Sequence, residues 1–265
     1  MKGLTRLIAA SLCCVLVAAG GASAQTGDRL TDKEVKALLD AVDKGRDRFE
    51  DQLDGTLKDS ILRLPNGEVN VARFLDDLQE NTGRLKERFT SEYAASAEVA
   101  AVLRQSTAID TFMKGKPGIK GGSEWDSLAA NLSRLAAVYG TTFPLQGDAP
   151  VRRINDAEAA EAAAAIEEQA DQFKGAVNRE QGLAKPAKDG LKSQADLVKN
   201  AAKTLKSRLN DSKRSTSEAR QLFAAMSKMR ESAGNLTQTS LALLGQMQAP
   251  LTTLSQAFGV AMPRN

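Results

Sequence analysis

The sequence predicts an all-α protein built from two tandem up-and-down four-helix units, arranged as two bundles or as one fused eight-helix body. Three observations support this fold class. Apolar residues recur with helical spacing along nearly the whole chain, and alanine is abundant while aromatic residues make up only 4%. The third is that the helical pattern of the first half returns in the second half.

The N-terminal 24 residues have the pattern of a secretory signal peptide. A basic start at Lys2 and Arg6 precedes an apolar run over residues 7–19, and small residues lead to a cleavage site between Ala24 and Gln25. The apolar run is shorter than the ~20 residues that a membrane span needs, and no later stretch replaces it. We therefore expect export to the periplasm or the cell exterior, with no transmembrane segment in the mature chain.

We assign residues 25–143 to the first helical unit. Thr31 and Glu34 have the spacing of a capping box, which opens a first helix whose apolar face extends to Leu57. The turn sequence of residues 64–67 follows this helix. A second helix has its apolar face on residues that recur at helical spacing, namely Val71, Phe74, Leu75, Leu78, Leu85 and Phe89.

Two more helices complete this unit. The third extends from about Ser96 to Phe112, and the glycine-rich stretch 114–122 cannot be helical. A second capping-box spacing at residues 123–126 predicts the start of a fourth helix, which stops at Gly140 because glycine commonly ends a helix.

Residues 144–154 contain two prolines and a glycine and are interpreted as a linker. Beyond it, residues 155–265 form the second unit, which is rich in alanine and basic. Its four helices are expected near residues 156–177, 187–212, 216–231 and 236–258.

The two units match in order at a nearly constant offset. Phe49 matches Phe173 at an offset of 124 residues, Arg88 matches Arg208 at 120, and the fourth helices match at 119. Any amphipathic helix that ends in glycine would produce one such match. Three successive matches favour tandem duplication.

The composition excludes several classes of active site. The chain contains no histidine, and its two cysteines, Cys13 and Cys14, lie within the predicted signal peptide. A Ser-His or Cys-His nucleophile, an ordinary zinc site, a c-type haem and a Glu-x-x-His di-iron site are therefore excluded. The adjacent carboxylates Asp76 and Asp77 would point about 100° apart on a helix. We expect no enzymatic activity, no metal and no cofactor.

Charge is distributed unevenly along the chain. Residues 183–230 contain 12 basic and 4 acidic residues, a net charge of +8. If one helix is continuous there, six lysines lie within about 80° of arc over about 38 Å. These lysines form the predicted lysine ridge, which consists of Lys188, Lys192, Lys199, Lys203, Lys206 and Lys213.

The lysine ridge has two interpretations. It could bind an extended polyanion or an anionic envelope surface, with the lysine stems along the apolar edge of the helix. Alternatively, these lysines flank the core of a bundle, where they are solvated or paired with Glu161 and Glu168 of the preceding helix. Charged runs are usually solvated faces, which favours the second interpretation.

Two other features of the first unit are candidate sites. The first helix carries an acidic ridge that is interpreted as a solvated face, although it could dock against the lysine ridge of another molecule. The acidic ridge consists of Asp40, Asp43, Asp47, Glu50, Asp51 and Asp54. Trp125 lies in a heptad-like apolar stripe, so we expect it in the core rather than on a stacking platform. The aromatic residues are concentrated in the first unit, which should be the more stable one.

These observations predict an exported non-enzymatic helical bundle that acts as an interaction, scaffold or envelope-associated module. An anionic envelope component or another protein is the expected partner, and self-association is a further hypothesis. Nucleic acid is disfavoured because the lysine ridge lacks aromatic residues for base stacking. The alternative is a bundle that holds a small apolar or amphiphilic ligand between its helices.

Overall fold

The computed structural model describes residues 28–262 except 65–66, 117 and 235. It confirms the all-α fold class, and the predicted cleavage site between Ala24 and Gln25 lies outside the described residues. No helix in the described part of the chain is long and apolar enough to cross a membrane.

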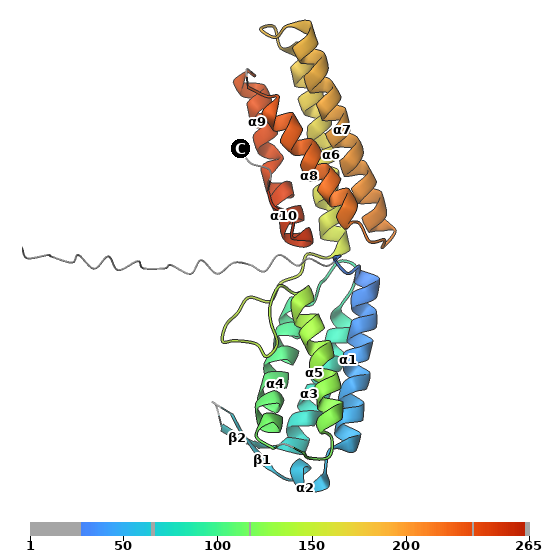
Figure 1. Cartoon of the computed structure of the whole chain (residues 1–265), viewed down its shortest axis with the longest axis vertical. Helices are drawn as coiled ribbons and strands as arrows, with labels where there is room; N and C mark the ends of the chain where they lie inside the picture. Colours follow the sequence, from blue (N-terminus) through green and yellow to red (C-terminus); the bar gives the residue numbers. More distant parts are fainter. Residues whose placement is uncertain (1–27, 65–66, 117, 235, 263–265) are drawn as a thin grey trace, which may run out of the picture.

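The described residues form two bodies, each with its own hydrophobic core, stacked end to end along the long axis of the molecule (Figure 1). Body 1 consists of α1 (Asp32–Gln52), α2 (Gly55–Lys58), β1 (Ile61–Leu64), β2 (Gly67–Asn70), α3 (Val71–Arg88), α4 (Ser96–Lys114) and α5 (Gly122–Val138). Body 2 consists of α6 (Asp156–Arg179), α7 (Lys185–Asn210), α8 (Thr216–Glu231), α9 (Gln238–Gln246) and α10 (Gln248–Phe258).

The start of α1 is as predicted, but its end is not. The Thr31 side chain accepts a hydrogen bond from the Glu34 amide, and the Glu34 carboxylate accepts one from the Thr31 amide, which completes the capping box. The helix ends at Gln52, five residues before Leu57. Asp54 ends it because its carboxylate accepts the Thr56 amide at 2.9 Å and so caps the separate α2.

A short β-hairpin between α2 and α3 was not predicted. Strands β1 and β2 pair antiparallel, with Leu64 opposite Gly67, and residues 65–66 of the predicted turn lie outside the described residues. Each strand has only four residues, and an apolar-polar alternation over so few residues does not distinguish a strand from a loop.

The second predicted capping box is wrong. A cap at Ser123 would start the helix at Glu124, but α5 begins two residues earlier, at Gly122, and Ser123 instead donates to the neighbouring Glu124 carboxylate. Gly121 has a φ of +94°, and a Cβ there would lie 3.2 Å from Leu53 Cα. The close approach of two chain segments, which only glycine permits, therefore sets the start of this helix.

The last predicted helix, residues 236–258, is two helices in the structure. The chain leaves α9 at Gln246, and α10 begins at Gln248. Pro250 lies in the first turn of α10, where its missing N–H is tolerated, whereas in the interior of one continuous helix it would remove a hydrogen bond.

The segment predicted as a linker, residues 144–154, is packed rather than free. Leu145 is buried in the core of body 1, and the Arg152 amide donates to the Tyr139 carbonyl at 3.1 Å. At its other end, Arg153 and Ile154 are buried. The segment thus places the start of α6 directly against body 1.

Candidate functional site

The lysine ridge is shorter in the structure than predicted. Helix α7 ends at Asn210, so Lys213 lies in the following loop and only the other five lysines share the helix. From Lys188 to Lys206 the helix rises about 27 Å.

Most lysines of the ridge have a carboxylate partner. Lys199 Nζ lies 2.6 Å from Asp171, and Lys206 Nζ lies 2.5 Å from Glu167, both on α6. Lys192 pairs with Asp189, and Lys213 with Asp211, each at 2.9 Å. The expected partners Glu161 and Glu168 are wrong, because neighbouring residues of α6 occupy that side. Lys188 and Lys203 have no ion pair within the described residues.

Four carboxylates of the acidic ridge, those of Asp40, Asp43, Asp47 and Glu50, are paired with basic residues of body 1. Arg46 is only 3% exposed and contacts the carboxylates of Asp43, Asp47 and Glu50. Lys86 Nζ of α3 reaches Asp43 at 2.7 Å. Burial alone would raise the pKa of Asp43, but hydrogen bonds from Lys86 and Arg46 lower it below its usual value.

Trp125 lies in the core of body 1, as predicted. It is 3% exposed, and its ring centroid lies 5.1 Å from that of Phe49. Its indole N–H donates to Asp110 Oδ1 at 3.2 Å, so the polar edge is satisfied internally. A stacking platform at Trp125 is thereby excluded.

An open surface groove lies between α6 and α9 of body 2. Its lining includes the small or apolar residues Gly175, Ala242 and Leu243 and the polar residues Gln172, Arg179, Gln238, Thr239 and Gln246. The groove is open at the surface, whereas the alternative prediction expects a ligand held in the interior of the bundle.

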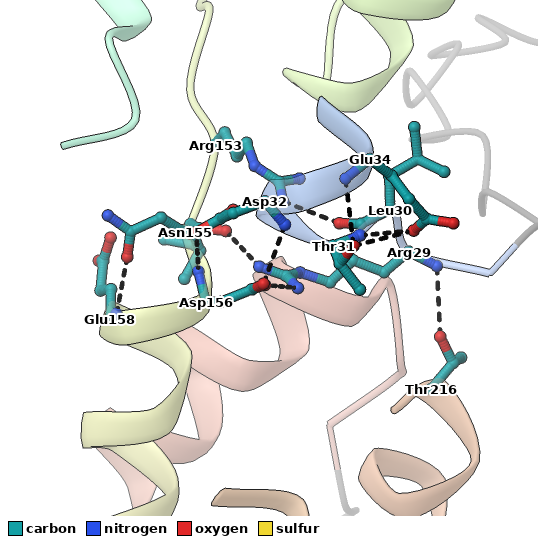
Figure 2. Close-up of polar contacts among 11 residues, drawn as sticks. Arg29, Leu30, Thr31, Asp32, Glu34, Arg153, Asn155, Asp156, Glu158 and Thr216 are labelled. Carbon is teal, nitrogen blue, oxygen red and sulfur yellow. Dashed lines mark hydrogen bonds and ion pairs between the residues drawn. The ribbon is translucent and has the colours of Figure 1, made fainter. Parts of the chain in front are cut away.

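The strongest cluster of buried charge lies where the two bodies meet (Figure 2). Helices α1 and α6 both begin there, capped by the side chains of Thr31 and Asn155. Asp32 and Asp156 are the first helical residues and are each 6% exposed. Both helix N-termini, with their partial positive charge, therefore face each other with a carboxylate on each.

The contacts between these two helix starts are reciprocal. The Asp32 amide donates to Asp156 Oδ2 at 2.9 Å, and the Asp156 amide donates to Asp32 Oδ2 at 2.9 Å. Arg153 pairs with Asp32 at 2.8 Å, and Arg29 pairs with Asp156. We call Arg29, Asp32, Arg153 and Asp156 the clasp.

The two arginines also bind main-chain and hydroxyl groups reciprocally. Arg29 Nη2 donates to the Ile154 carbonyl at 2.7 Å, and Arg153 Nη2 donates to the Leu30 carbonyl at 2.8 Å. The main-chain amide of Arg29 donates to Thr216 Oγ1 at 3.2 Å, and that of Arg153 donates to Ser96 Oγ at 3.4 Å. Each arginine thus links the start of its own first helix to the opposite body.

All four charged side chains of the clasp are buried. Desolvation lowers the pKa of Arg29 below its usual value, repulsion from Arg153 adds to this, and the Asp156 carboxylate opposes both. Two buried charges of each sign balance one another, so removal of one side chain would leave an uncompensated charge. The arrangement can hold two bodies in one orientation, and its carboxylates are engaged by arginines and amides.

Sequence reasoning missed the clasp although a signal was present. Residues 29–34 read RLTDKE and residues 153–158 read RINDAE, separated by the same 124 residues that relate the two first helices. The predicted match between the two units starts further along these helices, and the predicted linker includes Arg153. When the match is extended toward the N-terminus, Arg29 aligns with Arg153 and Asp32 aligns with Asp156.

Comparisons of the chain with protein-family models, with curated proteins and with solved structures found no match.

Proposed function

We propose that the protein is an exported, non-enzymatic structural adaptor of the cell envelope. Its two bundles form one elongated body whose far tips each contact a different envelope component. The observation that carries this proposal is the clasp, which joins the bundles by buried, reciprocal contacts. Loosely tethered domains would not need such a junction.

The clasp is suited to maintain a fixed orientation. Arg29 and Arg153 each bond a carboxylate and a carbonyl of the opposite helix start, so a rotation between the bodies would break several charge-assisted hydrogen bonds together. On the outside, Arg214 of body 2 pairs with Glu34 of body 1 at 2.8 Å. Breaking one buried pair by removing a single partner costs about 3–5 kcal/mol.

Each half of the molecule presents an exposed large apolar side chain away from the clasp. Ile61 on β1 is 53% exposed at the far end of body 1, and Leu241 on α9 is 42% exposed in the far part of body 2 (Figure 1). Leu197, which is 50% exposed, lies midway along α7 on the side of the molecule. The adaptor hypothesis assigns partner contacts to the first two positions.

A photo-crosslinking amino acid placed singly at Ile61, Leu241 or Leu197 tests the adaptor hypothesis in intact cells. We expect distinct protein adducts at Ile61 and Leu241 and none at Leu197, which is the matched exposed control. Adducts at all three positions, or at none, would contradict the assignment of partners to the tips.

The clasp variant Arg153→Met tests whether the fixed junction matters. In this variant, a single crosslinker at Ile61 or at Leu241 should still give its adduct. A chain with crosslinkers at both positions should capture both partners together at least severalfold less often than the same chain with an intact clasp. The control is Arg152→Met, because Arg152 is exposed and outside the clasp. Equal double capture by both variants would show that the junction has no part in function.

A second candidate function is supported by the groove between α6 and α9. Its mixed lining of apolar and polar side chains fits a small amphiphilic ligand. A hydrophobic probe dye should then bind saturably, and Leu243→Gln should weaken binding, whereas the same change at the exposed Leu197 should not. Non-saturable binding by both variants would reject this function.

A further inference from the structure

The two sides of the clasp are chemically equivalent, a property that the adaptor function does not require. Each hydrogen bond and ion pair that the four clasp residues make from body 1 to body 2 has a counterpart in the opposite direction. Such reciprocity is the signature of an interface with two-fold symmetry, where one surface is complementary to itself. Here two different halves of one chain occupy the two equivalent positions.

We propose that each end face is a self-recognition surface whose external partner is a second copy of this chain. Body 1 pairs with body 1 of another molecule, and body 2 pairs with body 2, through the same contacts that join the two bodies within one chain. This inference is independent of the adaptor function.

A pair of body 1 end faces offers Arg29 and Asp32 the same kinds of partner that they have in the clasp. Arg29 of each copy meets Asp32 of the other, as it now meets Asp156. The groups that replace those of body 2 are of the same kind: the Leu30 carbonyl replaces that of Ile154, Ser96 replaces Thr216, and Tyr139 replaces Phe258, whose ring lies 5.2 Å from the Arg29 guanidinium.

One contact breaks the symmetry and predicts which pairing is stronger. Arg214 of body 2 binds Glu34, but the equivalent position in body 1 is Ala94, which leaves Glu158 to pair with Arg152 at 3.2 Å. Two body 2 faces would gain an Arg214–Glu158 pair in both directions, whereas two body 1 faces would gain none. Pairing of body 2 with itself is therefore the tighter of the two.

Within one chain, the packed segment 144–154 holds the two end faces together. This gives the intramolecular contact a high effective concentration, so pairing between molecules needs a weakened contact within the chain.

Exchange of the clasp charges in body 2 alone distinguishes the contact within one chain from the pairing of like faces between two molecules. In the full chain with Arg153→Asp and Asp156→Arg, Arg29 faces a second cation and Asp32 a second carboxylate within the molecule. Pairing of like faces between molecules keeps opposite charges opposed. We expect a concentration-dependent dimer in light scattering at micromolar concentrations. A monomer at all concentrations, with helical circular dichroism unchanged, would overturn the proposal.

Two control variants test whether a dimer arises from the clasp charges or from altered surface charge in general. Adding Arg29→Asp and Asp32→Arg restores opposite charges within the chain, and this fourfold variant should be monomeric. Exchange of the neighbouring exposed pair, Arg152→Glu with Glu158→Arg, should also leave a monomer. Dimers of either control would attribute association to altered surface charge and overturn the proposal.

The wild-type clasp allows a test that does not depend on folding of the charge variants. The exposed residues 146–148 are replaced by a protease recognition sequence, and the folded full chain is cut there. Native mass spectrometry should then detect pairs of body 2 in addition to mixed pairs, and fewer pairs of body 1. Mixed pairs alone, over a range of concentrations, would overturn the proposal.

Discussion

The two bodies share their polar contacts but fill their cores differently. Lys86–Asp43 and Arg88–Glu98 of body 1 correspond to Lys206–Glu167 and Arg208–Glu218 of body 2. Two aromatic positions are common to the cores, because Phe49 and Tyr139 of body 1 correspond to Phe173 and Phe258 of body 2. The cores differ where Trp125 corresponds to Leu244, and where α6 of body 2 buries a series of alanines, Ala159, Ala160, Ala162, Ala163, Ala170 and Ala176. The ion pairs and the clasp are therefore compatible with different side chains in the two cores.

The difference in cores has an energetic consequence. A large aromatic side chain contributes about 1.5–3 kcal/mol on burial, and alanine contributes much less. Small side chains let α6 and α7 approach closely, but they leave body 2 with less apolar area per helix. Body 2 should therefore be the less stable of the two bodies, although the clasp couples them.

The largest expected effect that tests this difference is at Trp125. Trp125→Ala removes the ring that packs on Phe49 and leaves Asp110 without its indole donor, and should cost about 4 kcal/mol. The matched change in body 2 is Leu244→Ala, at the equivalent position, which should cost about 2–3 kcal/mol. Urea unfolding of the full chain measures both, and a greater loss at Leu244 would contradict the comparison.

Hydrogen exchange tests the order of opening directly. We expect amides in α6 and α9 to exchange at least about tenfold faster than those in α1 and α5, equivalent to about 1.4 kcal/mol in opening free energy. Slower exchange in body 2 than in body 1 would show that close helix packing outweighs aromatic burial.

A smaller, pH-dependent effect is expected at one position of body 2. Ser240 and Thr237 donate to the Glu180 carboxylate, and these hydrogen bonds lower its pKa below the usual value. Its stabilising contribution is thus present above the unfolded-state pKa and lost as the pH falls through the folded-state value. The decrease in Tm between pH 7 and pH 3 should be smaller for Glu180→Gln than for the wild type. The control Glu161→Gln, on the exposed side of α6, should show the wild-type decrease.

The smallest expected effect concerns the lysine ridge. Because four of its six lysines are paired with carboxylates, the ridge carries little free charge, and replacing Lys188 and Lys203 by Gln should reduce retention on an anionic matrix no more than replacing Lys36 and Lys44 of body 1. A clearly larger reduction for the body 2 variant would restore the interpretation of this ridge as an anionic binding surface.

Periodicity and capping chemistry predicted the helices because these signals are local. The hydrogen bonds of Thr31 with Glu34 and the left-handed Gly140 that follows α5 involve residues close in sequence. The start of α5 was mispredicted because a distant segment, at Leu53, decides it. The partners of the lysine ridge depended on the rotation of α6 against α7, which tertiary packing sets.

The sequence shows the two motifs of the clasp but could not predict that they contact each other. These motifs are 124 residues apart and are ordinary helix starts when each is considered alone. The antiparallel, head-to-head placement of α1 and α6 brings the two motifs into contact, with Arg29 against Asp156 and Arg153 against Asp32. This placement is a property of the tertiary structure.

Helices α1 and α6 both start at the clasp and extend in opposite directions (Figure 1), and Arg29, next to the first described residue, belongs to the clasp. The described chain therefore begins between the two bodies. An attachment point beside the clasp leaves the far ends of both bodies free. A tag or anchor fused on the N-terminal side of Asp28 would attach the protein near the middle of its long axis. The hairpin of body 1 and the α9 region of body 2 would then extend to opposite sides of the attachment point.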